Sequence, residues 1–351
     1  MQEYASLDEL DLSIVSALQL EPRGTWSRIG SALGVDAVTV ARRWAQMADS
    51  GSAWITCSPG PSQYTVLCTA FIDVQCEAGR TSEVAAAVSA MAQVATVEHV
   101  SGNRDLYLTV FVPDLAALSG FLLDVLAGLP GVRETRTQIA TRVYAEGSGW
   151  DLRALDSQQR AKMEESGTSK ASTVNSRYSL TDRDRELAAR LSYNGRESYT
   201  DLAAHLGVGV STVRRWLRHL IVDGHLSIRC EIARPLSDWP VSASVWSDVA
   251  AGDLDRVAQL VASLAETRMC MTLTGGPANL LFSVWLRTAG DLQRLEMELA
   301  RRVPAMTIVD RAVAFRHIKR MGRLLDREER SIGTVPVDAW DVPAAPAPPR
   351  V

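Results

Sequence analysis

Arginine and hydroxyl side chains at helical spacing form the clearest chemical pattern in this sequence. In VSTVRRWLR (210–218) they lie on the predicted helix face opposite the apolar Val213 and Leu217. They are Ser211, Thr212, Arg214, Arg215 and Arg218. Hydroxyl and guanidinium groups reach phosphates and major-groove base edges, so this face predicts binding of double-stranded DNA. A solvated charged face on a purely structural helical bundle is the alternative.

The same pattern occurs 173 positions earlier, in TVARRW (39–44). Thr39, Arg42 and Arg43 lie on or beside the outward face of this helix, with the arginine pair shifted by one position, and we predict that they contact DNA as well. The two copies differ in local charge. Residues 180–230 hold eight arginines and six acidic residues, whereas residues 7–57 hold four arginines and six acidic residues. Since phosphate neutralisation supplies much of the affinity for DNA, we expect the second copy to bind more strongly.

Both stretches belong to a longer internal repeat. A shift of 173 positions aligns residues 7–57 with 180–230 without a gap. The likeness continues beyond them, since VSGNRDLYLTVFV (100–112) aligns with LTGGPANLLFSVWL (273–286) after one inserted residue. The chain is therefore a duplication in which each copy has a small module followed by a larger one.

Each small module has the pattern of a helix-turn-helix unit. In the second copy, Ser198 is placed to cap a helix that stops at Gly207, and the next helix runs from Val210 to Asp223. Two helices joined by a tight glycine turn after a supporting helix are typical of this fold. Val213, Leu217 and Leu220, and in the first copy Val40, Trp44 and Met47, are expected to face the core. Residues 52–57 and 225–230 read as a short strand or wing in each unit.

Each larger module is predicted to be a ferredoxin-like βαββαβ unit, with two helices on one face of an antiparallel sheet. The elements are expected at 66–74, 80–93, 96–102, 105–112, 113–129 and 132–143, and again at 241–249, 253–264, 268–275, 279–287, 290–302 and 306–318. A two-residue turn, Asn103–Arg104, is expected between the middle strands. The strands are more apolar than a sheet with one face in water requires. The face without helices should therefore pack on the other copy or on a second chain.

The sequence thus predicts an α+β chain with a duplicated arrangement of domains. The expected parts are a helix-turn-helix domain at 1–60, a βαββαβ domain at 64–145, a polar linker at 146–178, a second helix-turn-helix domain at 179–232, a second βαββαβ domain at 239–330 and a disordered Pro/Ala-rich tail at 331–351.

Composition excludes several functions. A net charge of −4 and a pI near 5.8 mean that DNA contacts must come from local basic patches. Five scattered cysteines without CxxC or a zinc-type Cys/His spacing predict free thiols and no metal site. No cofactor motif or catalytic constellation occurs, so we expect neither a cofactor nor catalytic residues. Without a signal-peptide pattern or an apolar span, the chain is expected in the cytoplasm with the nucleoid, away from membranes.

The order of motifs resembles a known family. LDELD, IVSAL, IGSALGV and TVARR, followed by VSGNRDLYLTVFVPDLAALSGFL and LPGVRETRTQIATR, resemble the Lrp/AsnC (feast/famine) transcription regulators. The resemblance covers 7–145 well and 180–318 more loosely. It implies DNA binding through the third helix, βαββαβ domains of the RAM or AsnC C-terminal type that form homo-oligomers, and amino-acid effectors. Because such chains usually carry one copy, this chain resembles a fused dimer.

The resemblance also implies an effector site. In that family the turn between the middle strands lies near the effector, which implies binding roles for Gly102, Asn103, Arg104 and Asp105, and for Gly275 in the second copy. The second copy reads TGGPANL where the first reads SGNRDL, so it lacks the Arg and the Asp. We therefore expect an amino acid or a related small molecule to bind the first copy. The alternative is that Arg104 and Asp105 only stabilise the hairpin.

Two other functions stay open. Fused chains of this architecture also resemble sirohaem decarboxylases, which would hold a tetrapyrrole near this hairpin, and His99 is the candidate residue here. SGNRDLYL and TGGPANLL lack the His/Tyr/Arg-rich hairpin that such an enzyme would need. A structural or interaction module with two degenerate helix-turn-helix units is the other alternative.

Overall fold

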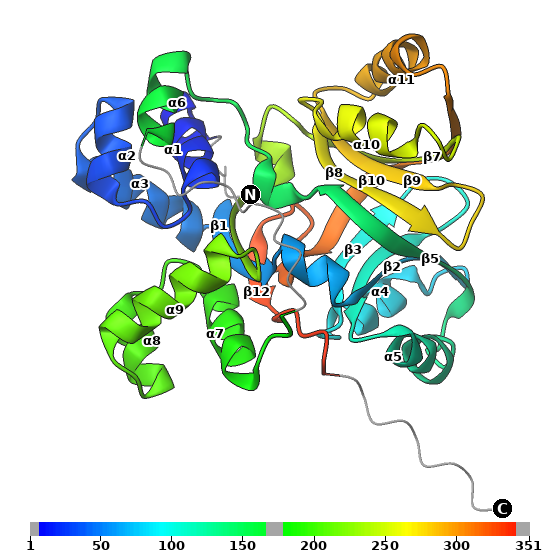
Figure 1. Ribbon diagram of the computed structural model, residues 1–351, viewed down its shortest axis with the longest axis horizontal. Helices are drawn as coiled ribbons and strands as arrows, with labels where there is room; N and C mark the ends of the chain where they lie inside the picture. Colours follow the sequence, from blue (N-terminus) through cyan, green and yellow to red (C-terminus); the bar gives the residue numbers. More distant parts are fainter. Residues whose placement is uncertain (1–6, 166–177, 342–351) are drawn as a thin grey trace, which may run out of the picture.

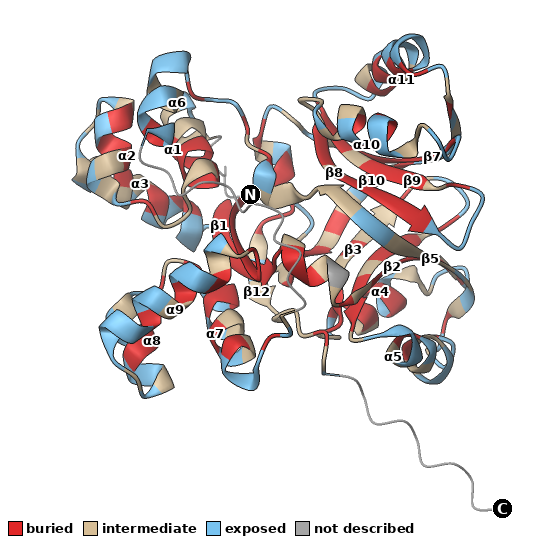
Figure 2. Ribbon diagram, viewed as in Figure 1, coloured by how far each residue is buried: buried red, intermediate tan, exposed pale blue. Residues whose placement is uncertain are grey.

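The computed structural model describes residues 7–165 and 178–341 and places the two helix-turn-helix units together on one side of a large sheet domain (Figure 1). Buried residues follow the strands and the inward faces of the helices (Figure 2). Within these described residues, no helix combines the length and the apolar character that a membrane span requires.

The first unit consists of α1 (Glu9–Leu20), α2 (Trp26–Leu33) and α3 (Ala37–Asp49). Side-chain caps set where the helices begin, because Asp8 accepts from the Asp11 backbone N–H and Asp36 accepts from the Val38 backbone N–H. The turn between α2 and α3 passes through Gly34, whose φ of 72° lies in the left-handed region that glycine adopts without strain. The predicted helix-turn-helix is therefore confirmed in this copy.

The second unit repeats the first with α7 (Asp182–Tyr193), α8 (Tyr199–Leu206) and α9 (Val210–Val222). Ser198 caps α8 as predicted, and Gly207 ends it in the left-handed conformation with a φ of 65°. The predicted inward residues of both third helices are buried, namely Val40, Trp44, Met47, Val213, Leu217 and Leu220.

The expected wing strands have a different role. β1 (Ala53–Pro59) and β6 (Leu226–Ile232) do not form a wing within each unit but pair with each other as an antiparallel ribbon, with Ile55 opposite Cys230. All residues of both strands are buried. The two units share one apolar core across this ribbon, so they form one body rather than two separate domains.

The linker and the tail are more ordered than predicted. After the short η3 turn (Gly147–Gly149), α6 (Ser157–Glu164) packs beside the first unit, and the linker buries Trp150, Leu152, Leu155 and Met163 in the shared core. At the other end, β12 (Ser331–Thr334) pairs with β11 (Arg323–Leu325) and Ala339 is fully buried, which corrects the expected disorder of this part of the tail. Residues 166–177 and 342–351 lie outside the described residues.

Both larger modules have the predicted βαββαβ order. The first comprises β2 (Cys68–Cys76), α4 (Thr81–Ser89), β3 (Val94–Val100), β4 (Leu106–Val112), α5 (Leu115–Gly120) continued by the π-helix η2 (Phe121–Leu126), and β5 (Val132–Ala145). The second comprises β7 (Val241–Val249), α10 (Leu254–Ala262), β8 (Thr267–Thr274), β9 (Leu280–Leu286), α11 (Gly290–Arg302) and β10 (Met306–Arg320). The connection between β3 and β4 spans residues 101–105, so the expected two-residue turn is wrong.

The two modules close on each other. β5 pairs with β2 of its own module and with β8 of the other, and β10 pairs with β7 and with β3. Eight strands therefore form a closed ring in the order β10-β3-β4-β2-β5-β8-β9-β7, with β11 and β12 as an extension. Phe71, Tyr107, Trp246 and Leu281 fill the space between the two modules. The uncovered faces thus pack on the other copy in the same chain, which was one of the two predicted solutions.

A buried carboxylate joins the helix-turn-helix pair to this ring. Glu231 on β6 is 1% exposed and lies 3.0 Å from Arg268 of β8, 3.2 Å from Arg229 of β6 and 3.4 Å from Arg320 of β10. Burial alone would raise the pKa of Glu231, but the charges of these arginines lower it to about 2. The guanidinium of Arg268 also lies 3.9 Å from the ring centroid of Trp285. The carboxylate is therefore the common partner of three elements.

We predict that Glu231→Gln destabilises the chain by about 3–5 kcal/mol, because it leaves buried guanidiniums without their counter-charge. Urea unfolding at neutral pH measures the change. The control is Glu328→Gln, whose side chain is 60% exposed, and its effect should stay within about 0.5 kcal/mol. An equal effect of both substitutions would contradict the role of Glu231.

The pH dependence of the free energy of unfolding gives a second test of the role of Glu231. The ordinary pKa of a glutamate is 4.5, and the folded value of Glu231 is about 2. Ionised Glu231 therefore stabilises the fold fully above pH 4.5, and this contribution is lost as the pH falls towards 2. Glu231→Gln should lack this part of the acid-induced loss of stability.

Candidate nucleic-acid interface

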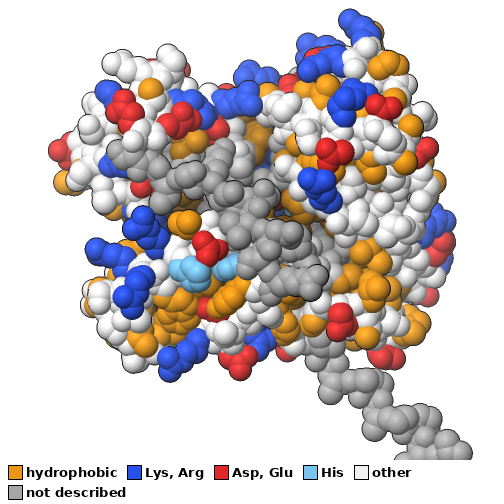
Figure 3. Space-filling model, viewed as in Figure 1, with side chains coloured by type: hydrophobic (Ala, Val, Ile, Leu, Met, Phe, Trp, Pro, Cys, Tyr) orange, Lys and Arg blue, Asp and Glu red, His pale blue; other side chains and the backbone are white. Residues whose placement is uncertain are grey.

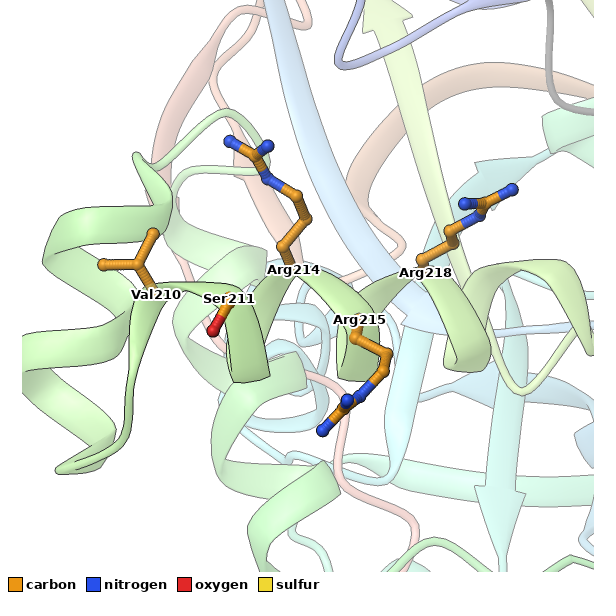
Figure 4. Close-up of a pocket in the computed structure, with 5 residues that line it drawn as sticks. All are labelled: Val210, Ser211, Arg214, Arg215 and Arg218. Carbon is orange, nitrogen blue, oxygen red and sulfur yellow. The ribbon is translucent and has the colours of Figure 1, made fainter.

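The exposed face of α9 carries the predicted DNA-contacting groups of the second unit. Ser211, Thr212, Arg214, Arg215 and Arg218 are all exposed. A hollow of about 520 Å³ is lined by four of them and by Val210. Figure 4 shows Arg214 and Arg218 extending to one side of the helix and Arg215 to the other. Because α9 starts at Val210, its first turn also presents unpaired backbone N–H groups to an anion.

The three guanidiniums of α9 have no acidic partner among the residues that the structure describes. Among the ion pairs between described residues, none involves Arg214, Arg215 or Arg218. Arg214 lies 5.1 Å from the ring centroid of Tyr199, which orients it without neutralising it. Figure 3 shows basic side chains gathered over this unit, whereas acidic and basic groups are interspersed over the first unit. Phosphate oxygens would therefore displace only water from these groups.

The corresponding face of α3 is weaker. Arg42 is exposed, with its Nη1 atom 3.4 Å from Oε1 of Gln46, and Thr39 is half-buried. Where α9 carries Arg214 and Arg218, the 173-residue shift places Ala41 and Ala45 in α3. Val38, at the position of Ser211, is 75% exposed. Among the described residues, Arg42 is thus the arginine of α3 without an acidic partner, and its contact with DNA stays a prediction.

Arg43 does not extend from the surface with Arg42. Its Nη1 atom lies 2.6 Å from Oδ2 of Asp8 and 3.1 Å from Oδ1 of Asp11. Hydrogen bonds from these two carboxylates raise the pKa of Arg43. The guanidinium therefore holds α3 against the start of α1. A contact of Arg43 with DNA stays a prediction.

The second unit makes the same bond with another side chain. Trp216 corresponds to Arg43 and Asp184 to Asp11, and the Trp216 indole N–H donates to Oδ1 of Asp184 at 2.7 Å. Asp184 is 1% exposed and also accepts from Thr181 and Tyr178. Sequence reasoning missed this equivalence, although the alignment of an acid in both first helices was its available signal.

The predicted effector residues lie where the two modules meet. Gly102 and Gly275 adopt φ values of 103° and 97°, and each lies against the last strand of the other module, Gly102 near Arg311 and Gly275 near Thr137. Asp105 accepts a hydrogen bond from the Cys76 backbone N–H at 2.7 Å, and the Asn103 carbonyl accepts one from Gln75. These contacts hold the hairpin itself.

Arg104 fills the middle of this junction. Its side chain is 3% exposed, pairs with Asp73 at 3.3 Å and with Asp310, and lies 4.4 Å from the ring centroid of Trp246. Burial raises the pKa of Asp73 to about 6, and Arg104 counteracts this shift. The contacts of Arg104 and Asp105 therefore favour the hairpin-stabilising alternative, and effector binding here stays a prediction.

His99, the candidate for tetrapyrrole binding, is half-buried on β3. Its ring packs edge-on against Phe315 of β10, with 5.1 Å between centroids. This is a packing contact between two strands of the ring.

Family comparisons agree with the two kinds of module. Residues 7–48 match the AsnC-type helix-turn-helix domain, residues 69–150 the Lrp/AsnC ligand binding domain, and residues 179–224 a Homeodomain-like domain. An uncharacterised HTH-type transcriptional regulator of Pyrococcus furiosus is 33% identical over 146 residues, covering 40% of this chain and 96% of its own length. The HTH-type transcriptional regulator FL11 of Pyrococcus horikoshii is 28% identical over 143 residues, covering 40% of this chain and 93% of its own length. Each relative therefore corresponds in length to one copy of the repeat.

A solved structure resembles the whole duplicated chain. The siroheme decarboxylase NirDL, in co-complex with an iron-uroporphyrin III analogue, superposes with a TM-score of 0.56, covering 90% of this chain and 93% of its own. The sequences are 15% identical, so the likeness shows a shared fold and carries no activity to this chain.

We predict that Trp216→Phe destabilises the second unit by about 1–3 kcal/mol, because the buried Asp184 carboxylate loses a hydrogen-bond donor. Its neighbour Arg215 is exposed, so Arg215→Ala should change stability by less than about 0.5 kcal/mol. Urea unfolding followed by helix circular dichroism compares the two variants. If Arg215→Ala is the more destabilising substitution, the assignment of a bracing role to Trp216 is wrong.

Proposed function

Because this chain belongs to the Lrp/AsnC family of transcription regulators, we propose that it binds double-stranded DNA mainly through α9 of the second unit. The observation that carries this proposal is the set of three exposed guanidiniums on α9, each without an acidic partner in the described protein. Each phosphate neutralised by such a group releases counter-ions and adds to affinity. The chain is a DNA-binding regulator, and α9 is its proposed principal contact.

The first unit is proposed to give a weaker and different contact. Arg42 remains available, whereas Arg43 is held by two carboxylates and two alanines replace the other arginines. Since both units are fixed to one core through the β1–β6 ribbon, binding by α9 brings α3 to a set position relative to the same DNA.

Effector binding is proposed at the junction of the two modules. The match to a ligand binding domain supports it, as do the charges of Asp73, Arg104 and Asp310, which suit an α-ammonium and an α-carboxylate. An amino acid entering here would replace part of the internal ion pairing of Arg104. Further assembly of chains is also proposed, although the pairing of sheet modules is already satisfied within one chain.

Replacing Arg214, Arg215 and Arg218 together with alanine should abolish most DNA binding. The slope of log K against log salt should fall by about 2.7, since each phosphate contact contributes about 0.9. Gel shifts with DNA from upstream of the chain's own gene, over a salt series, measure both quantities.

The matched control removes three other exposed arginines, Arg256, Arg294 and Arg302, which lie on α10 and α11 and alter net charge equally. It should bind like wild type. Equal losses in both variants, or no binding by wild type at low salt, would refute the proposal. In the second case a Soret shift with an added tetrapyrrole that His99→Ala abolishes would favour the decarboxylase alternative.

The preferred binding site should be asymmetric. The two recognition faces differ at three aligned positions, Val38 against Ser211, Ala41 against Arg214 and Ala45 against Arg218. Groups that reach base edges in one half-site are thus missing in the other. Selection from a random DNA pool should return two unlike half-sites, and a perfect palindrome as the best binder would contradict this prediction.

A further inference from the structure

A cluster of metal-binding side chains lies at the C-terminal end of the recognition helix α9. His219, Asp223 and His225 each offer one ligand atom, and these atoms lie within 4.8 Å of one another. We propose that the three side chains bind a divalent transition metal ion, with zinc the best fit, and thereby tie the end of α9 to the segment that follows β1. Its ligands are none of the predicted DNA-contacting residues, and the site departs from the sequence-based expectation of no metal.

His225 is held in place through its Nδ1 atom. It is 2% exposed, and its Nδ1 atom lies 2.7 Å from the Ser62 hydroxyl oxygen. The Ser62 hydroxyl also lies 2.9 Å from the Gly224 carbonyl, so it can accept Nδ1–H while donating to that carbonyl. The Nε2 atom of Gln63 lies 3.5 Å from Nδ1 and donates to the Tyr178 carbonyl at 2.8 Å. With Nδ1 engaged inside the protein, Nε2 is the ring nitrogen of His225 that would bind a metal ion, with Ser62 as the outer hydrogen-bond partner.

The other two ligands come from one turn of α9. His219 and Asp223 are four residues apart, and Nδ1 of His219 lies 2.8 Å from Oδ2 of Asp223. Bonds of about 2.0–2.2 Å to a tetrahedral ion place ligand atoms about 3.4 Å apart. The present spread of up to 4.8 Å can close by rotation of the His219 side chain, which is 57% exposed. The fourth position of such an ion would be open to water.

The chemistry of the cluster selects the type of ion. Two imidazoles and one carboxylate favour zinc and neighbouring transition metals over magnesium or calcium, which prefer oxygen ligands. The carbonyl end of a helix is also the favourable end for a cation. Figure 3 shows histidine side chains beside a carboxylate on the surface of this unit.

The site would connect the two copies. Ser62 lies in the 3-10 turn η1 (Pro61–Thr65), which follows β1 of the first copy, whereas the ligands belong to the second. The Tyr178 ring stacks on His225 at 4.4 Å, and the Tyr178 hydroxyl donates to Asp184, the carboxylate that also binds Trp216 of α9. At the corresponding positions the first copy has Gln46, Ser50 and Ser52, so it could not form the same site.

Isothermal titration of the full chain with Zn²⁺, after removal of metal by a chelator, tests the proposal. One ion should bind per chain and raise the melting temperature. His219→Ala and Asp223→Asn should each weaken binding by more than tenfold, and Ser62→Ala by about 10–100-fold as expected for an outer-shell partner. His205→Ala is the matched control, because His205 is an exposed histidine of the same unit, and it should bind like wild type.

Co²⁺ as a second probe distinguishes the ligands, since thiolate coordination gives a charge-transfer band that an imidazole and carboxylate site lacks. The proposal is overturned if His219→Ala binds Zn²⁺ as tightly as wild type, if the cobalt spectrum shows thiolate ligands, or if no saturable binding occurs. Circular dichroism of each variant verifies that the fold is retained. None of these outcomes depends on whether α9 binds DNA.

Discussion

The arrangement of the whole chain depends on the ion pairs of one buried carboxylate, Glu231. It lies on the strand that joins the second helix-turn-helix unit to the sheet domain, and its three arginines come from β6, β8 and β10. Charges buried at this depth keep their partners, because separating them would leave each one unsolvated. The DNA-binding pair and the ring of strands are therefore held in one geometry. This junction is one route by which a change in the ring would reach the helices.

Much of the fold could be predicted because the same local signals occur at matching positions in both copies of the repeat. Helix caps, glycine turns and alternating apolar residues are local signals, and the elements they predicted are present. The pairing of β1 with β6 could not be predicted in this way, since it joins residues far apart in sequence and both strands look alike in isolation. Trp150 and Leu152 were assigned to a flexible linker because isolated apolar residues in a polar segment show no periodicity.

Only some features of the candidate sites could be predicted from the sequence. The exposed positions of α9 follow from helical phase alone, and the structure places them as expected. The ion pairs of Arg43 could not be predicted, because phase does not reveal that two acids of α1 lie within reach of its guanidinium. His219, Asp223 and His225 escaped notice because their spacing matches no standard zinc pattern, and Ser62, which orients His225, is distant in sequence. The contacts of Arg43 and Ser62 join segments that the sequence gives no reason to bring together.

The closure of the ring by β5 and β10 affects how the protein responds to its own abundance. Two separate chains with this arrangement would dissociate on dilution, and the concentration of dimers with two recognition helices would then fall with the square of the chain concentration. Here both helices belong to one polypeptide, and each module's last strand is paired with the other module. The pairing of the two recognition helices within one chain therefore does not depend on how many molecules of this chain a cell contains.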